Sequence, residues 1–352
     1  MPKSLNYKDI AELRGKIDLI DNQIVELMIG RHEVSEKIIS LKKSAEYDVF
    51  DKSREKEIIR ELTFKYGDKL SVDEIKAMFN VILKYSKLRH NSLNEIAEAS
   101  SVRDVLCYKP FIIAGPCTVE SDEQMEKTVS GLAELGIRLL RGGTFKPRTS
   151  PDTFQGLGAE GIKILRKYAE KYNMFTVTEV LDEKQLLEHY DDIDVIQIGS
   201  RNMTNFSFLN QVGKITTRDK KPVILKRGYG STLNEFVEAG RYITQFGNEN
   251  VILCLRGIRT FEQIDSNMRN TPDLGAISEL KDKSDLNIIF DPSHATGVSK
   301  YVIDISKAAV TLGADGLLIE AHHNPAEALI DGKQTITPAD LTDLITFIKQ
   351  RF

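Results

Sequence analysis

Eight polar residues occupy equivalent places in this sequence. Each lies at or just after the end of a short run of aliphatic and β-branched residues. In chain order they are Cys117, Arg141, Glu179, Arg201, Lys226, Arg256, His294 and Glu320. Four of them are cations, and Lys146 and Arg148 follow in the loop after the second run. If the eight residues surround one site as a ring, the Arg and Lys side chains of that ring suit phosphate and carboxylate oxygens. The set predicts a site for a small anion carrying more than one phosphate group.

The same ring contains residues that could bind a metal ion. Cys117, His294 and Glu320, with Asp331 in the next loop, combine soft, borderline and hard donors, which is typical of a divalent transition ion with open positions for substrate. The donors do not select among manganese, iron, cobalt and zinc. The alternative for Cys117 is a small buried residue after a Gly-Pro turn, which is how we interpret Cys254.

Eight apolar runs must position these residues. They begin at Phe111, Ile137, Met174, Val195, Pro222, Val251, Ile288 and Gly316, and helical stretches separate them. Continuous apolar strands alternating with helices are typical of a parallel sheet covered on both faces. Eight such units favour an α/β protein with a (β/α)8 TIM barrel, whose strand ends meet at one mouth. No G-x-G-x-x-G follows the first run, which disfavours a dinucleotide-binding fold.

The N-terminal part has a different, helical periodicity. Apolar residues spaced three and four apart predict one long helix over residues 10–41, and two shorter helices follow. The third is predicted to begin after Ser71, with Glu74 completing a capping box. We therefore expect a small all-α three-helix domain at residues 1–92, a linker at 93–108 and the barrel at 109–352.

Two cations interrupt the apolar face of the first predicted helix. Arg31 occupies a position where the heptad requires an apolar residue, and Lys42 lies about 20° from it around the helix. A cation on a core face is costly unless paired. The pair predicts a buried dianion. The alternatives are that Arg31 pairs with Glu55, or that the domain is only a dimerisation coiled coil.

Composition excludes several classes of protein. The 48 Lys and Arg against 52 Asp and Glu give a net charge of −4, which argues against general binding to nucleic acid or anionic membranes. No apolar run approaches the ~20 residues of a membrane span. The polar N-terminus does not resemble a signal peptide, and three cysteines are too few for a disulfide framework. We expect a cytoplasmic protein whose partners are small molecules.

Several short motifs of the predicted barrel resemble those of a known family. GPC at 115–117, LRGGTFKPRTSP at 140–151, IQIGSRNM at 196–203, DPSHATG at 291–297 and ADGLLIEAHHNP at 314–325 resemble the 3-deoxy-D-arabino-heptulosonate 7-phosphate (DAHP) synthases. The resemblance implies condensation of phosphoenolpyruvate with erythrose 4-phosphate, with a divalent metal ion polarising the aldehyde. A related synthase of 3-deoxy-octulosonate 8-phosphate, which uses arabinose 5-phosphate, is the alternative; KPRTS at 146–150 favours erythrose 4-phosphate.

The resemblance also implies roles for individual residues. The catalytic residues would be Lys146, Cys117 and His294, with Lys146 as the proton donor. Phosphoenolpyruvate would contact Arg141, Lys146, Arg201, Lys226 and Arg256. Erythrose 4-phosphate would contact Lys146, Pro147, Arg148, Thr149 and Asp331. The metal ligands would be Cys117, His294, Glu320 and Asp331.

The helical part resembles the all-helical chorismate mutases, on LRGKID at 13–18, Arg31, Lys42 and DKSRE at 51–55. The resemblance implies conversion of chorismate to prephenate, regulation of the barrel by these ligands, or both. Contacts with them would come from Arg14, Arg31, Lys42, Asp51, Arg54, Glu55, Ser86 and His90. His90 replaces a Gln or Glu of relatives, which predicts a rate that is reduced or shifted to lower pH. The resemblances imply dimeric mutase domains within a homo-oligomer, a tetramer for the barrel.

Overall fold

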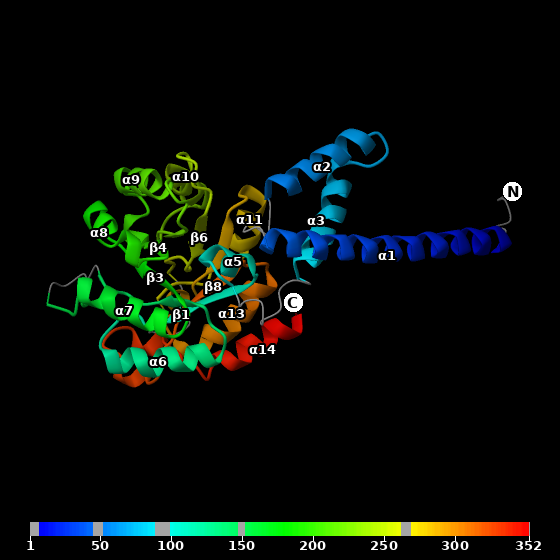
Figure 1. The fold of residues 1–352 in the computed structure, drawn as a ribbon. Helices are drawn as coiled ribbons and strands as arrows, with labels where there is room; N and C mark the ends of the chain where they lie inside the picture. Colours follow the sequence, from blue (N-terminus) through cyan, green and yellow to red (C-terminus); the bar gives the residue numbers. More distant parts are fainter. Residues whose placement is uncertain (1–6, 45–51, 89–98, 147–151, 262–268, 352) are drawn as a thin grey trace. The chain divides into compact units, whose positions relative to one another are not determined.

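The computed structural model of the protein describes residues 7–44, 52–88, 99–146, 152–261 and 269–351 (Figure 1). The chain divides into two compact units, Met1–Asn91 and Ser92–Phe352. The first is helical and the second contains the sheet. None of the helices in the described residues combines the length and apolar character that crossing a membrane requires.

Eight parallel strands close into a barrel in chain order, which confirms the predicted fold. The barrel closes where β1 pairs with β8, from Phe111 opposite Gly316 to Gly115 opposite Glu320. The strands are β1 (Phe111–Gly115), β2 (Leu139–Arg141), β3 (Phe175–Glu179), β4 (Val195–Ile198), β5 (Val223–Lys226), β6 (Val251–Leu255), β7 (Asn287–Phe290) and β8 (Gly316–Glu320).

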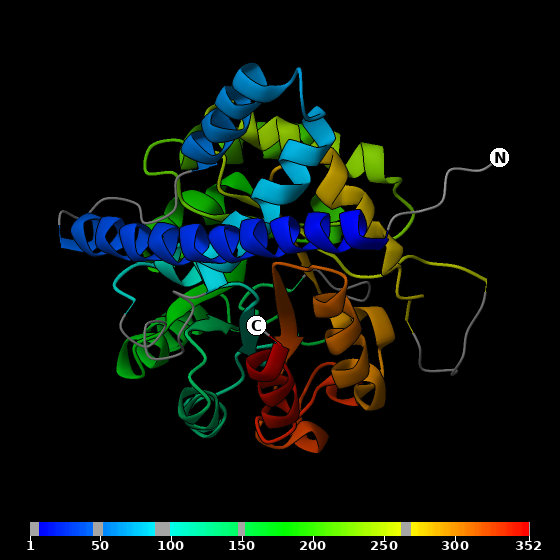
Figure 2. The ribbon, with the colours of Figure 1, turned by 90° about the vertical axis from the view of Figure 1, so that its right-hand side faces the viewer.

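Helices surround the barrel on its outside (Figures 1 and 2). They are α6 (Asp122–Glu134), α7 (Ala159–Lys171), α8 (Glu183–Glu188), α9 (Phe206–Thr216), α10 (Leu233–Thr244), α11 (Gly275–Lys283), α13 (Val302–Thr311) and α14 (Leu341–Arg351). The short helix α12 (Pro292–Thr296) follows β7 and lies at the mouth, where its His294 lines the cavity. The larger apolar core lies between these helices and the strands, and a smaller core fills the barrel interior. Cys254 belongs to the interior core, as its position inside β6 predicted.

The segment expected as a linker contains a short helix, α5 (Val102–Cys107), which the sequence reasoning missed. Ser101 and Asp104 form a capping box at its start. Val105 and Leu106 are buried in the interior core with residues from the beginnings of strands, including Phe111 and Val195. The helix therefore packs over the end of the barrel opposite the strand C-termini, so residues 99–108 are part of the barrel unit rather than a free connection.

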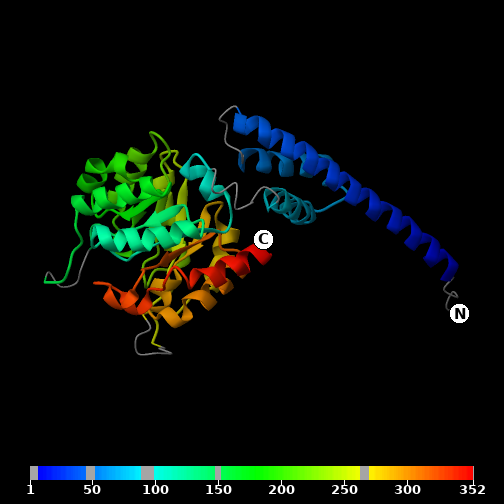
Figure 3. The same ribbon diagram turned by 60° about the horizontal axis from the view of Figure 1, so that its bottom comes forward.

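The helical unit consists of α1 (Tyr7–Ser44), α2 (Lys52–Tyr66) and α3 (Val72–Leu88). Ser71 and Glu74 exchange the two hydrogen bonds of the predicted capping box. The first half of α1 projects well beyond α2 and α3 (Figures 1 and 3). The apolar residues of α1 are accordingly exposed in the single chain: Ile17 is 56% and Leu27 is 74% accessible.

Candidate active site

The C-terminal strand ends converge on one cavity of about 430 Å³. Seven of the residues predicted for the barrel site line it, namely Cys117, Lys146, Arg201, Lys226, Arg256, His294 and Asp331. Arg141 and Glu320 are almost completely buried and join each other through an ion pair, Nη2 to Oε1, at 3.2 Å. Pro147, Arg148 and Thr149 lie outside the described residues.

Two buried guanidinium nitrogens in this site have no hydrogen-bond partner among the residues that the structure describes. They are Nη1 of Arg141 and Nε of Arg256. Arg256 donates its Nη1 to the Oγ of Ser200 at 3.2 Å, which leaves the Nε edge for a ligand. A buried donor without a partner is costly unless something binds there. The two nitrogens therefore fit an anion that supplies acceptor oxygens.

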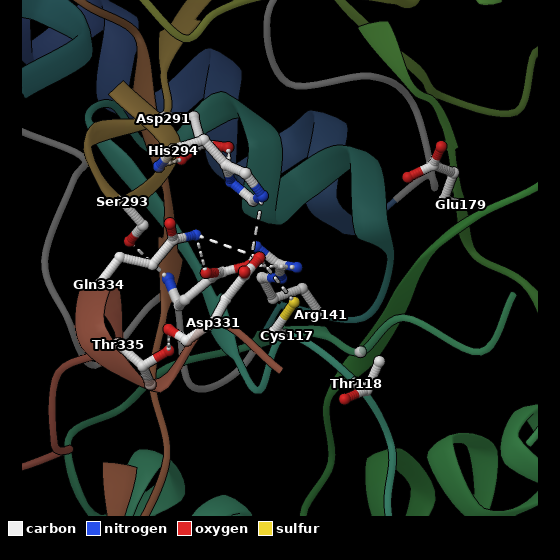
Figure 4. A network of polar contacts seen from close by, with 12 residues as sticks. Cys117, Thr118, Arg141, Glu179, Asp291, Ser293, His294, Asp331, Gln334 and Thr335 are labelled. Atoms are coloured by element: carbon white, nitrogen blue, oxygen red, sulfur yellow. Dashed lines mark hydrogen bonds and ion pairs between the residues drawn. The ribbon is translucent and has the colours of Figure 1, made fainter. Parts of the chain in front are cut away.

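A cluster of potential metal ligands lies beside Arg141 (Figure 4). The ligand atoms of Cys117, Glu320 and Asp331 lie within 4.8 Å of one another. Oε1 of Glu320 is buried in its ion pair with Arg141, a contact that lacks hydrogen-bond geometry among the described residues, and Nε2 of His294 lies 3.5 Å from it. Three mutually close O and S donors, with the imidazole nitrogen of His294 beside Glu320, fit a divalent transition ion.

Asp291 orients His294 for such a role. It is the N-cap of α12, and its Oδ1 accepts the backbone N–H of His294 at 2.8 Å. Its Oδ2 lies 2.8 Å from Nδ1 of His294 and also pairs with Lys226. A proton on Nδ1, held by Asp291, leaves the lone pair of Nε2 facing Glu320.

Burial sets the protonation states of the cluster. It lowers the pKa of His294 to about 4, against the opposing effect of Asp291 and Glu320, so the imidazole is neutral at pH 7. Burial works against the carboxylate of Glu320, but His294 when protonated, and Arg141, outweigh it and hold that pKa at about 2. Burial, and then Glu320, raise the pKa of the Cys117 thiol. Binding a metal would therefore release the thiol proton.

Lys146 joins the metal-ligand cluster to the anion side of the cavity. Its Nζ donates to Sγ of Cys117 at 3.3 Å. The side chain crosses Gly143 so closely that a Cβ there would lie 2.3 Å from Cε of Lys146. Gly143 therefore has to be a glycine for the lysine to reach this position.

The cavity also contains residues that sequence reasoning did not assign. They are Thr153, Tyr229, Arg259, Arg269 and Asn270, and Glu179, which was in the ring but had no role. The ring of Tyr229 lies between two guanidinium groups, 5.0 Å from Arg256 and 5.1 Å from Arg259. His322 and His323 do not line the cavity; their rings stack on each other at 4.5 Å. The sequence could have indicated Arg259 as a cavity residue, because it lies in the loop after β6, three residues beyond Arg256.

In the helical unit the structure brings together two of the predicted residues. Nη1 of Arg31 donates to Oγ of Ser86 at 2.6 Å, and Ser86 is buried. Lys42 and Glu55 are half-buried. Arg14 is exposed, and Arg54 forms ion pairs with Glu57 and Glu61. Asp51 and His90 lie outside the described residues.

Comparisons with known proteins match both units. Residues 107–351 match the sequence model of the DAHP synthetase I family, and residues 13–91 match that of chorismate mutase type II. A phospho-2-dehydro-3-deoxyheptonate aldolase of Thermotoga maritima is 46% identical over 239 residues, covering 68% of this chain and 69% of that protein. A 2-dehydro-3-deoxyphosphooctonate aldolase of Francisella tularensis is 29% identical, covering 69% and 91%.

Solved structures give the same result. The crystal structure of the Thermotoga maritima DAHP synthase superposes with a TM-score of 0.65 at 45% identity and covers 69% of each chain. A truncated form of the enzyme from that organism superposes with a TM-score of 0.62 at 41% identity, covering 69% of this chain and 86% of the other.

Proposed function

We propose that this chain, which belongs to the DAHP synthetase I family and carries a chorismate mutase type II domain ahead of its barrel, condenses phosphoenolpyruvate with erythrose 4-phosphate at the barrel mouth. The observation that carries the proposal is a cavity lined by Arg256, Cys117 and Asp331, with Arg141 and Glu320 buried beside it. Among the described residues, Nη1 of Arg141 and Nε of Arg256 have no hydrogen-bond partner. Carbon three of phosphoenolpyruvate bonds to the aldehyde carbon, water adds at carbon two, and phosphate leaves by C–O cleavage.

The cations of the cavity bind and hold the two phosphorylated substrates. Arg141, Lys146, Arg201, Lys226 and Arg256 hold phosphoenolpyruvate, and Pro147, Arg148 and Thr149 hold erythrose 4-phosphate from the adjoining loop. Two multiply charged anions repel each other in free solution. Fixed cations offset that repulsion and position the reacting carbons, which supplies the proximity and electrostatic parts of the rate enhancement.

Cys117, His294, Glu320 and Asp331 hold a divalent metal ion, and Asp331 also faces erythrose 4-phosphate. When bound, the ion acts as a Lewis acid on the aldehyde oxygen. Lys146 donates a proton to the alkoxide that forms on that oxygen. Its contact with Cys117 supports this role, since it places the ammonium group beside the metal-ligand cluster.

Arabinose 5-phosphate is the alternative second substrate, because octulosonate synthases are also similar to this barrel. The higher identity of the Thermotoga heptonate enzyme, 46% against 29%, favours erythrose 4-phosphate. The test supplies the purified protein with phosphoenolpyruvate, Mn²⁺ and either aldose phosphate, and follows phosphate release. Turnover with arabinose 5-phosphate alone would replace the proposed reaction by the octulosonate one.

For the helical domain, we propose conversion of chorismate to prephenate, feedback inhibition of the barrel by these ligands, or both. The Arg31–Ser86 contact supports a carboxylate site, because Arg31 interrupts an apolar face and Ser86 is buried beside it. The test measures chorismate consumption by the full-length protein from pH 5.5 to 8.5. Turnover that rises at low pH supports catalysis assisted by protonated His90. Inhibition of DAHP formation without turnover would make the domain a sensor. If the protein shows neither turnover nor inhibition, the proposal is overturned.

A second copy of the chain covers the apolar face of α1. Its residues Ile17, Ile20, Ile24 and Leu27 are each more than half exposed, which is unfavourable in water. Antiparallel or intertwined pairing of two such helices buries the face and places Arg14 near the partner's site. Light scattering of the full-length protein and of Ile24→Lys tests this pairing by measuring the molar mass in solution. We expect the variant to lose the helix pairing and to have a lower mass. An unchanged mass would contradict the pairing.

A further inference from the structure

The loop after β6 returns to the cavity as a second polypeptide segment, the return segment, Arg269 to Thr271. The outgoing and returning segments pair through Ile258 and Thr271, which exchange backbone hydrogen bonds of 3.0 and 2.9 Å. Arg256 and Arg259 lie on the outgoing side, with the anion-binding residues. The return segment lies on the side of the metal-ligand cluster.

Arg269 in the return segment holds Asp331 with both arms of its guanidinium group. Nη1 donates to Oδ2 at 3.1 Å, and Nη2 donates to Oδ1 at 2.9 Å. A two-pronged pair of this kind fixes the plane of the carboxylate as well as its position. Asp331 is 14% exposed at its side chain and adopts a left-handed backbone conformation, with φ of 59°.

The orientation that results keeps Asp331 directed at the other ligands. Its Oδ2 remains 3.5 Å from Sγ of Cys117 and 3.5 Å from Nε2 of Gln334. Gln334 also donates to Glu320, so one buried amide lies between the two carboxylates. A carboxylate has about four lone-pair sites over its two oxygens, so the two hydrogen bonds from Arg269 leave lone pairs for a metal ion.

The same segment is attached to the helix that carries His294. The backbone N–H of Arg269 donates to Thr296 at 3.3 Å, and that of Asn270 donates to Ala295 at 3.1 Å. Nδ2 of Asn270 donates to the carbonyl of His294 at 2.9 Å. One short segment thus contacts both α12 and Asp331, which come from separate loops.

We infer that Arg269 is a positioning residue for the metal site: it holds the Asp331 carboxylate in the orientation that ligates the ion. The inference rests on the proposed metal site of Cys117, His294, Glu320 and Asp331. Partners that hydrogen-bond a metal ligand typically contribute 10–100-fold to metal affinity. The opposite expectation is simple electrostatics, in which a cation beside the site repels the ion, so that its removal tightens binding.

The experiment compares Co²⁺ affinity of the full-length protein with that of two variants, Arg269→Gln and Arg259→Gln, by competition with a chromophoric chelator. Arg259 is the matched control, since it lies in the same loop and cavity and its substitution removes the same charge. We expect Arg269→Gln to weaken Co²⁺ binding about 10–100-fold and Arg259→Gln to change it less than about threefold. Circular dichroism spectra that match the wild type establish that both variants are folded.

Each outcome decides between the alternatives. Equal affinity in the two variants, or tighter binding by Arg269→Gln, would overturn the positioning role while leaving the metal site in place. Absence of stoichiometric Co²⁺ binding by the wild-type protein would overturn the metal site and the inference together. The thiolate-to-cobalt absorption band, which reports Cys117, separates specific binding from binding elsewhere on the surface.

Discussion

Nη1 of Arg31 lies 2.6 Å from Oγ of Ser86, a contact that joins α1 to α3 across 55 positions of the chain. Ser86 in turn donates to the carbonyl of Ile82 at 3.0 Å, so the hydroxyl group is fixed on its own helix. The contact gives the guanidinium group a polar neighbour on a helix face that is otherwise apolar. In the proposed carboxylate site of the helical unit, both groups would contact the ligand.

Arg31→Ala is expected to weaken chorismate binding about 10–100-fold, because a hydrogen bond to a charged group contributes about 1.5–3 kcal/mol. Isothermal titration of the full-length protein with chorismate measures the change. Arg60→Ala, on the exposed side of α2, is the control and should bind as the wild type does. Equal affinities for all three proteins would favour the interpretation of the helical unit as a dimerisation element only.

Cys117→Ala is expected to reduce metal-dependent DAHP formation to below about 1% of wild type, because the soft ligand of the proposed metal ion is lost. Cys254→Ala is the matched control: it removes an equally buried thiol from the barrel interior, away from the mouth. It should lose some thermal stability and keep its metal stoichiometry. Full synthase activity of Cys117→Ala would remove Cys117 from the metal site.

Arg148→Ala is expected to raise the KM for erythrose 4-phosphate about 10–100-fold and that for phosphoenolpyruvate by less than about threefold, since one charged hydrogen-bonding partner of a single phosphate is removed. Initial rates measured with each substrate varied in turn distinguish the two. Equal effects on both KM values would contradict the assignment of the two phosphates. Arg148 lies outside the described residues, so this assignment stays a prediction from the sequence.

The pH dependence of folding stability can be tested at Asp315, which lies at the end of the barrel where the strands begin. It is buried, lies 2.8 Å from Nζ of Lys109, pairs with Lys281 and accepts the N–H of Ile288 at 2.7 Å. Burial opposes its ionisation, but Lys109 and Lys281 outweigh burial and lower the pKa of Asp315. Because the folded pKa is below the unfolded value of about 3.9, the stabilisation is present above that pH and lost as pH falls through the folded pKa.

Asp315→Asn should therefore lower the free energy of unfolding by about 1–3 kcal/mol at pH 7. The difference from wild type should shrink below about pH 4. Urea midpoints at pH 7, 5 and 3.5 measure it. Asp343→Asn breaks the exposed pair with Lys307 and should change stability by less than about 1 kcal/mol. A difference between Asp315→Asn and wild type that is constant with pH would show that the ion pairs do not cause it.

The sequence predicted those parts of the molecule that depend on local pattern. Apolar runs gave all eight strands, and the polar residue at the end of each run identified the mouth because parallel strands end on one face. Ser71 and Glu74 predicted a helix start that depends on four consecutive residues. The roles of the individual site residues remain predictions, since residue type and position along the chain do not assign a substrate atom to each side chain.

The features missed by the sequence analysis depend on tertiary contacts. Arg269 lies in a loop that returns to the cavity, and no spacing in the sequence relates it to Asp331, 62 residues later. Gln334 is a neutral residue in a turn, and its importance appears only when its amide is seen between two carboxylates. The periodic apolar pattern of α1 likewise does not state which chain covers the face that is exposed in the single chain.

Helix α5 determines where this protein can be divided. A fragment beginning at residue 109 would lack Val105 and Leu106 and would expose to water the apolar interior at the beginnings of the strands. A fragment beginning at residue 99 keeps that helix and also the carbonyl of Ala99, which accepts a hydrogen bond from Arg138 at 3.0 Å. The barrel start predicted from the sequence, residue 109, thus differs from the physical start of the barrel unit, which includes α5. A division of the two domains should therefore leave residues 99–108 attached to the barrel.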